Sequence, residues 1–351
     1  MKNRKVWGMA LAILASVLSI SACSGSGNST TTAGNDSTTA GTAAGSESTA
    51  SETSTDWPKQ DLHVLVGFSA GGTSDMGTRL LFQQAQPDLG VNVVVENVTG
   101  AGGWNAWSQL ASSKPDGYTI ALVTDPTIYG GYLDPSNNRK NTLDDFRFVC
   151  NQVMDDAAIA INPKDTRFTD LKSLIDYAKQ NEVTCTTTGI GSQVHLMLLR
   201  MNDELGTKFV PLATKGTSEG KTMILGGNVD VFMACVGDIA PSHKSGELKC
   251  VAVSSEDRSE YMDDVPTMVE LGYPLIHCYS SRGYMFPAGV DDAIVEKMDN
   301  ILKKAMESPE HKKAMDDMCL RINYIGHEEF TKQMYDDEAM MKNYSDLFGW
   351  N

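Results

Sequence analysis

From residue 57 onward, short apolar runs rich in β-branched side chains alternate with longer stretches whose apolar residues recur at helical spacing. The runs predict strands at 63–68, 91–96, 118–123, 157–161, 184–188, 229–235 and 249–254. The longer stretches predict helices at 75–86, 105–112, 170–180 and 193–204, and a C-terminal helix with an apolar face of Ile294, Met298, Ile301, Leu302 and Ala305. This alternation favours an α/β fold with largely parallel sheets, in a segment long enough for two lobes.

The start of the chain has the pattern of an export signal. Three cationic side chains precede an apolar run at 6–15, which is too short for a confident membrane span. We therefore expect residues 1–22 to be a secretory signal. The segment Ile20-Ser21-Ala22-Cys23 resembles the lipobox of bacterial lipoproteins, which implies that Cys23 becomes the lipid anchor. The alternative is an ordinary signal peptide with a chance cysteine near its cleavage site.

The composition changes after Cys23. Residues 24–56 are almost entirely Ser, Thr, Gly and Ala, with no Lys, Arg or aromatic residue. Such a segment cannot bury enough apolar surface to offset the entropy of ordering it, so we expect residues 23–56 to be a lipid-anchored disordered linker. The length of this spacer favours an extracytoplasmic location, on the outer face of a Gram-positive cell membrane.

The chain is strongly acidic, with 45 Asp and Glu against 29 Lys and Arg and a formal net charge of −16. Removal of the signal takes away positive charge only. This balance argues against nucleic acid or an anionic membrane surface as a partner, because both require clustered cations. Any site for an anion must therefore be positive locally, through backbone N–H groups and helix N-termini.

The cysteines and histidines do not form a metal-binding pattern. Neither residue type recurs at ligand spacing, and we expect no metal and no cofactor. An even number of cysteines after Cys23 permits disulfides, but the wide spacing favours buried free thiols. These six are Cys150, Cys185, Cys235, Cys250, Cys278 and Cys319.

Three loops rich in glycine and small polar residues each connect a predicted strand to a predicted helix, at 68–75, 99–103 and 187–192. In doubly wound sheets, ligands bind where such loops lead into helix N-termini. Glycine lets the backbone approach a ligand closely, and Thr73 or Ser74 is positioned to cap the next helix, as Thr169 is for the helix at 170–180. Tight turns are the alternative for any one loop, whereas three in the same context favour an anion site.

The first loop also permits an enzymatic interpretation. Residues 67–71 satisfy the G-x-S-x-G pattern of a hydrolase nucleophile elbow, with Ser69 as the nucleophile of a secreted serine hydrolase. However, the loop follows the first strand of the domain, which leaves no earlier strand to supply an oxyanion loop, and no histidine is an evident partner. We therefore expect a binding protein with no catalytic residues.

An ordered set of motifs carries a family resemblance. The chain is similar to the receptors of tripartite tricarboxylate transporters, the Bug family. The matching segments are Phe68-x-x-Gly71-Gly72-x-x-Asp75, Glu96-Asn97-x-x-Gly100-Ala101-Gly102-Gly103, Pro115-Asp116-Gly117-Tyr118-Thr119, Asp145-Phe146, Gly191-Ser192 with His195, residues 225–230, 245–249 and 258–259, Val265-Pro266-Thr267 with Glu270 and Gly272, and Pro287-Ala288-Gly289. They cover nearly everything from Trp57 to the C-terminus.

The resemblance implies a periplasmic-binding-protein-like fold of two lobes, each a mostly parallel sheet flanked by helices, that close on a ligand. Lobe 1 would comprise 57–155 plus 279–351 and lobe 2 would comprise 156–278, with two strands crossing between them. It further implies a monomeric receptor that captures a small organic carboxylate and delivers it to integral membrane transporter subunits. The implied ligand-binding residues are Phe68, Ser69, Ala70, Gly71, Gly72, Thr73, Asp75, Gly100, Ala101 and Gly103, and, from the opposing lobe, Thr188, Gly189, Ser192 and His195.

Three positions depart from the family pattern. Ser69-Ala70 stands where the family often has proline after the aromatic residue of the first loop. Trp104 follows the second loop, where it would wall the pocket or pack at the start of a helix. Arg282 would pair with a second ligand carboxylate or form an ion pair with one of the protein's own acids near the lobe boundary. The sequence leaves both alternatives open.

Overall fold

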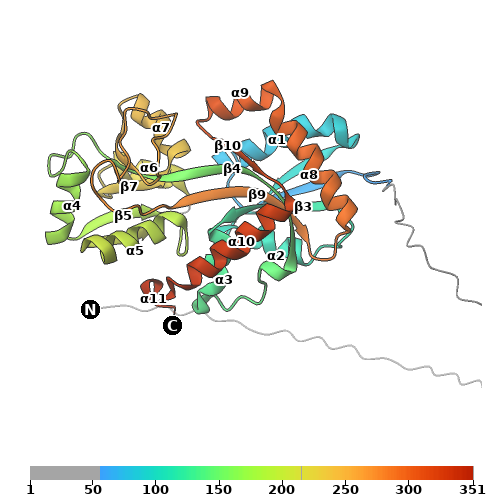
Figure 1. Ribbon diagram of the computed structural model, residues 1–351, viewed down its shortest axis with the longest axis horizontal. Helices are drawn as coiled ribbons and strands as arrows, with labels where there is room; N and C mark the ends of the chain where they lie inside the picture. The colour runs from blue at the N-terminus through green and yellow to red at the C-terminus, as the bar shows by residue number, and fades with distance from the viewer. Residues whose placement is uncertain (1–55, 215, 351) are drawn as a thin grey trace, which may run out of the picture. The chain divides into compact units, whose positions relative to one another are not determined.

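The computed structural model describes residues 56–214 and 216–350 (Figure 1). The predicted signal at 1–22, the anchor Cys23 and the predicted linker, apart from Asp56, lie outside the described residues.

The first lobe is built on a sheet in the order β2-β1-β3-β9-β4. Three of its strands are parallel, namely β1 (Leu62–Val66), β2 (Val93–Asn97) and β3 (Thr119–Asp125). The helical segments of this part of the chain are α1 (Thr73–Leu89), η1 (Ala101–Gly103), α2 (Trp104–Ala111), α3 (Thr127–Leu133), η2 (Pro135–Asn137), η3 (Leu143–Asp145), α8 (Asp292–Glu307), α9 (Pro309–Asp317), α10 (His327–Lys342) and α11 (Ser345–Phe348).

The second lobe repeats this arrangement. Its parallel strands are β5 (Val183–Thr187), β6 (Phe209–Ala213) and β7 (Val231–Cys235), and β8 (Lys249–Val253) pairs with β4. Its helices are α4 (Leu171–Gln180), α5 (Gln193–Leu205), α6 (Thr217–Leu225) and α7 (Val236–Lys244). In both lobes the parallel strands lead through short loops into helices, as the sequence predicted.

Two long antiparallel strands join the lobes. β4 (Phe146–Ile161) and β9 (Tyr279–Pro287) pair along the whole of β9 and run side by side from one lobe into the other (Figure 1). Residues 146–156 of β4 pair with β9, and within them Asn151 and Val153 also pair with β10 (Ile322–Ile325), whereas residues 157–161 pair with β7 and β8. The sheets are thus mixed rather than largely parallel. The lobe boundaries at 155 and 278 stay a prediction.

The structure corrects two predicted helix caps. Gly72 precedes α1 and makes no side-chain cap, so neither Thr73 nor Ser74 caps this helix. Asp170, not Thr169, caps α4, because its side chain accepts a hydrogen bond from the backbone of Ser173 in a capping box.

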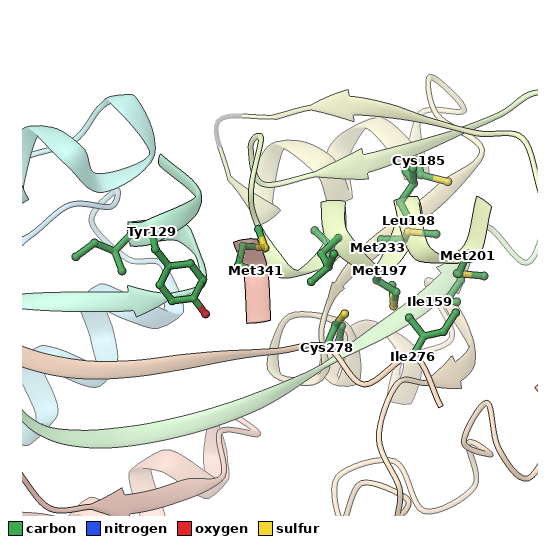
Figure 2. Close-up of a cluster of buried hydrophobic side chains, with 14 of the residues drawn as sticks. Tyr129, Ile159, Cys185, Met197, Leu198, Met201, Met233, Ile276, Cys278 and Met341 are labelled. Carbon is green, nitrogen blue, oxygen red and sulfur yellow. The ribbon is translucent and has the colours of Figure 1, made fainter. Parts of the chain in front are cut away.

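A sulfur-rich core supports the second lobe. Met197 and Met201 of α5 gather with Met233 of β7, and Met341 of α10 lies between them and Tyr129 of α3 (Figure 2). All six described cysteines are buried free thiols, as predicted. Within 56–214 and 216–350, no helix is both long and apolar enough to cross a membrane, and no group of His, Cys, Asp and Glu is arranged to hold a metal ion.

Candidate functional site

The first two glycine-rich loops lie against each other at the end of the first sheet. A Cβ placed on Gly67 would lie 2.6 Å from the Cα of Gly103, so the two backbones meet where no side chain fits. Because β1 and β2 are parallel neighbours, their carboxyl ends bring both loops to the same edge.

The second loop has an unusual backbone. Gly100, Ala101, Gly102 and Gly103 all have positive φ, with Ala101 at 52°. A non-glycine residue in this region is strained, and such strain persists only where the surrounding structure enforces it. The first three of these residues are exposed, so their peptide groups are accessible to a ligand.

Asp75 holds the first loop from below. Its side chain, 3% exposed, accepts hydrogen bonds from Gly71 N at 2.8 Å, Asn97 Nδ2 at 2.9 Å and Arg79 Nε at 2.9 Å. Burial alone would raise the pKa of Asp75, but these partners lower it below its usual value. Asp75 therefore fixes the loop, while Ser69, Ala70 and Gly71 are exposed at its tip.

The start of α1 adds positive polarity to this loop. No side chain caps the helix, so the N–H groups of its first turn are free of the usual capping acceptor. Thr73 is the first residue of the helix and is half-buried, as is Gly72 before it, and Phe68 packs into the core below. The helix N-terminus therefore points its partial positive charge toward the exposed tip of the loop.

The third loop lies in the second lobe, before α5. Ser192 caps α5, accepting from His195 N at 3.4 Å and donating to Gly189 O at 2.8 Å. The Nδ1 of His195 accepts from Gly191 N at 3.3 Å, and the imidazole ring packs on Phe348 with 5.1 Å between centroids. Burial lowers the pKa of His195 to about 4, so the ring is neutral at physiological pH.

Ser192 and His195 thus lie behind the third loop and shape it. Thr188 and Gly189 are half-buried, and Ile190 is exposed. This loop meets the first lobe at α3, because a Cβ on Gly130 would lie 2.7 Å from Gly191 O. The two lobes therefore approach each other beside the candidate site. Gly67 and Gly130, which permit both close approaches, were not among the predicted site residues.

The two residues left open by the sequence have clear surroundings. Trp104 is buried, packs edge-on against Trp107 at 5.5 Å and lies under the guanidinium of Arg139 at 4.8 Å. Arg282 pairs with Asp155, with 3.1 Å from Nη2 to Oδ2. Trp104 is therefore a packed aromatic side chain, and Arg282 forms an ion pair within the protein.

Comparison with known proteins identifies the family. A family model described as the tripartite tricarboxylate transporter family receptor matches residues 78–344. The chain belongs to this receptor family. The protein BugT of Bordetella pertussis is 32% identical over 266 residues, which are 74% of this chain and 80% of BugT. These matches confirm the resemblance seen in the motifs.

Solved structures show the same two-lobed fold. The periplasmic binding protein BugD superposes with a TM-score of 0.74 at 26% identity, covering 84% of this receptor and 99% of BugD. MatC from Rhodopseudomonas palustris, solved with bound malate, superposes with a TM-score of 0.74 at 21% identity, covering 83% of this receptor and all of MatC. The predicted periplasmic-binding-protein-like fold is confirmed.

The hydrolase alternative finds no support in the receptor. Ser69 is exposed, and its carbonyl accepts from Gly72 N at 3.3 Å. Within the described ranges, no histidine, Asp or Glu is hydrogen-bonded to the Ser69 hydroxyl, and the Nδ1 of His195 is occupied in the other lobe. A nucleophilic serine needs a base within hydrogen-bond reach, and the arrangement here supplies none.

The receptor also has a cavity of about 260 Å³ beside the middle of β4, lined by none of the residues of the three loops. Its walls carry five acidic residues, namely Asp155, Asp156, Glu256, Asp257 and Glu260, against two arginines and one histidine. Like charges disfavour an anion in this cavity. The loops, rather than this cavity, are the candidate anion site.

A pair of carboxyl groups lies at the end of β3, beside the candidate site. Asp125, 1% exposed, accepts a hydrogen bond from Tyr129, and Tyr279 Oη donates to Asp337 Oδ2 at 2.8 Å. Burial, followed by the neighbouring Asp337 carboxyl, raises the pKa of Asp125 well above its usual value. Two adjacent carboxyl groups do not ionise together at low cost, so the folded receptor retains a proton here.

Replacing Asp125 with asparagine is expected to stabilise the receptor at neutral pH. Because the pKa of Asp125 is raised on folding, its contribution to stability is full below the unfolded pKa and falls as pH rises through the folded pKa. The amide of asparagine does not ionise, so it avoids the loss of stability that follows when the buried Asp125 carboxyl gives up its proton. Its oxygen still accepts a hydrogen bond from Tyr129. We expect the free energy of unfolding at about pH 7 to rise by about 1 kcal/mol or more.

Denaturant unfolding of both proteins between about pH 5 and 8 measures this effect. Wild-type stability should fall more steeply with pH than that of Asp125→Asn. A variant less stable than wild type at neutral pH, with an unchanged pH slope, would refute the shared proton.

Proposed function

We propose that the receptor captures a small organic carboxylate between its two lobes, chiefly through backbone N–H groups. The observation that carries this proposal is the contact of the first two loops at Gly67 and Gly103, which sets the exposed positive-φ backbone of 100–102 beside the uncapped N-terminus of α1. Exposed N–H donors and a helix dipole suit a carboxylate. Malate bound to the structurally similar MatC supports this ligand class.

The proposed roles of the site residues follow from their positions. Ligand contact is assigned to Ser69, Ala70, Thr73, Gly100, Ala101, Thr188 and Gly189, whereas Gly71, Gly72 and Gly103, whose N–H groups donate to Asp75, Ser69 and Gly100, shape the loops that the ligand meets. Phe68, Asp75, Ser192 and His195 position these loops from beneath, because their polar groups or rings are already engaged in the protein. Backbone recognition explains how a chain of net charge −16 attracts an anion without a basic pocket.

We further propose that the receptor binds its ligand without turnover and delivers it to integral membrane transporter subunits. The family assignment supports this role. The pattern at 1–22, with Cys23 and the linker at 23–56, supports a lipid-anchored, extracytoplasmic receptor. In this arrangement the linker would hold the binding lobes clear of the membrane surface.

A thermal-shift screen of the purified protein against small organic acids tests carboxylate binding. An acid present at a hundredfold its dissociation constant should stabilise the folded state by about 2.7 kcal/mol. For a domain of this size, that free energy corresponds to a rise of roughly 5 °C in melting temperature.

The matched control is the carboxamide of each acid, which has a similar shape and no negative charge. We expect the acid to raise the melting temperature and its amide to leave it unchanged. If no acid raises the melting temperature, or if acids and amides do so equally, carboxylate capture at these loops is refuted.

A further inference from the structure

A buried charged cluster lies on the two strands that join the lobes. Arg282 on β9 is 6% exposed, and its Nη2 donates to Oδ2 of Asp155 on β4 at 3.1 Å. The other carboxylate oxygen of Asp155 accepts from Gly237 N, at the start of α7, at 3.1 Å. The cluster thus links the joining strands to the second lobe.

Strand register places this cluster on the face toward α1. Tyr284, two residues from Arg282 and therefore on the same face of β9, donates to Thr78 Oγ1 of α1 at 3.2 Å. From Tyr284 to Arg282 the strand runs toward the loop end of the sheet, where α1 begins.

The same face is directed toward α5 in the second lobe. Cys235 pairs in register with Ala157, two residues beyond Asp155, and Gln193, the first residue of α5, donates to Cys235 Sγ at 3.1 Å. Arg282 and Asp155 therefore lie on the strand face between the N-terminal ends of α1 and α5, which we call the floor, and Asp155 also lines the acidic cavity beside β4.

Two polar atoms at this floor have no partner. The Nη1 of Arg282 and the Oγ1 of Thr124 are both buried without a hydrogen bond among the described residues. Thr124 and Arg282 are directly paired across β3 and β9, so their side chains project from the same face. Buried donors without partners are costly, and two on one strand face between the lobes indicate a place where a ligand atom completes the hydrogen bonds.

The charges around Arg282 determine which kind of ligand atom can bind there. Arg282 already faces two carboxyl groups, Asp155 at 3.1 Å and Asp238 in the first turn of α7. The side chain of Asp238 is itself fixed by a hydrogen bond from Thr217 Oγ1 at 3.1 Å. A second ligand carboxylate would be a third acidic group around one guanidinium, which disfavours it in a buried place.

We propose that Arg282 Nη1 and Thr124 Oγ1 bind a neutral oxygen of the ligand, a hydroxyl or keto oxygen, a short chain away from its carboxylate. This inference rests on the proposed function. It makes hydroxy- or keto-monocarboxylates the preferred class over dicarboxylates of equal length.

Calorimetric titration of the purified protein tests this specificity. For straight chains of about three to six carbons, three acids are compared at each length: the terminal hydroxy acid, the diacid and the unsubstituted acid. At the best length, the hydroxy acid should bind roughly tenfold or more tightly than either of the others, because only it satisfies both buried atoms without adding charge.

Thr124→Val is the matched variant, since it keeps the shape of the side chain and removes only an unpartnered hydroxyl. It should retain the melting temperature, lower hydroxy-acid affinity by roughly five- to tenfold and leave the unsubstituted acid unchanged. Equal losses for both acids, or tighter binding of the diacid by the wild type, would overturn the inference alone. Failure of every acid to bind would instead refute the proposed function.

Discussion

Replacing Gly67 with alanine is expected to separate the first two loops and weaken carboxylate binding. The new Cβ would lie 2.6 Å from the Cα and 2.9 Å from the carbonyl oxygen of Gly103, and both are backbone atoms that a rotamer change cannot move. We expect a loss of about 1–3 kcal/mol in the free energy of unfolding. Loss of one charge-assisted hydrogen bond to the displaced loop should also lower affinity by roughly 10- to 100-fold.

Gly77→Ala is the matched control. Gly77 lies within α1, and a Cβ there would meet its nearest neighbours at 3.9 Å, an ordinary contact. Alanine also favours the helix, so this variant should be as stable as wild type or slightly more so, with unchanged affinity. Denaturant unfolding and calorimetry measure both quantities. Wild-type affinity in Gly67→Ala would show that the contact between the loops does not form the site.

Replacing Arg282 with methionine is expected to destabilise the receptor by about 3–5 kcal/mol, because it leaves the buried Asp155 without its cation. Burial already raises the pKa of Asp155 to about 7, although Arg282 lowers it. Without Arg282 the pKa of Asp155 rises further. At low pH the Asp155 carboxylate therefore binds a proton and is no longer a buried, unpaired charge. The destabilisation should therefore be larger at about pH 8 than at about pH 5.

A second substitution separates charge from packing. Asp155→Asn in the Arg282→Met background removes the uncompensated charge and keeps an oxygen to accept from Gly237, so it should restore most of the lost stability. The control is Arg258→Met, which breaks an exposed pair with Glu270 and a hydrogen bond to the carbonyl of Asp263, and which should change stability far less than Arg282→Met. Denaturant unfolding of these variants between about pH 5 and 8 measures their free energies of unfolding. A double variant no more stable than Arg282→Met would contradict the charge explanation.

The sequence predicted those parts of the fold that depend on local pattern. The helix at 193–204 and the strand at 184–188 have clear periodicity, and the structure places α5 and β5 within one residue of them. Residues 146–156 of β4 were missed, because they include the polar side chains Asn151, Gln152 and Asp155. These side chains are buried only because distant partners satisfy them, as Ser281 does for Asn151 at 2.6 Å.

The candidate site likewise has parts that the sequence pattern predicts and parts that depend on contacts between distant residues. The three loops were visible because glycine, serine and threonine mark strand-to-helix turns in the sequence itself. The importance of Gly67 and Gly130 was not visible in the sequence. Each must lack a side chain because its backbone meets that of a glycine far along the chain, Gly103 and Gly191 respectively. The unpartnered hydroxyl of Thr124 likewise has meaning only beside Arg282, which the pairing of β3 with β9 brings next to it.

The most direct test of carboxylate capture by these loops is a ¹⁵N-¹H correlation NMR titration of the purified protein with an acid identified by thermal shift. The amide resonances of Gly71, Gly72, Gly102 and Gly103 should move saturably, with the dissociation constant found by calorimetry, and the corresponding carboxamide should leave them in place. Saturable binding that moves the resonances around 255–261, beside the acidic cavity, while these glycines stay fixed would contradict the account.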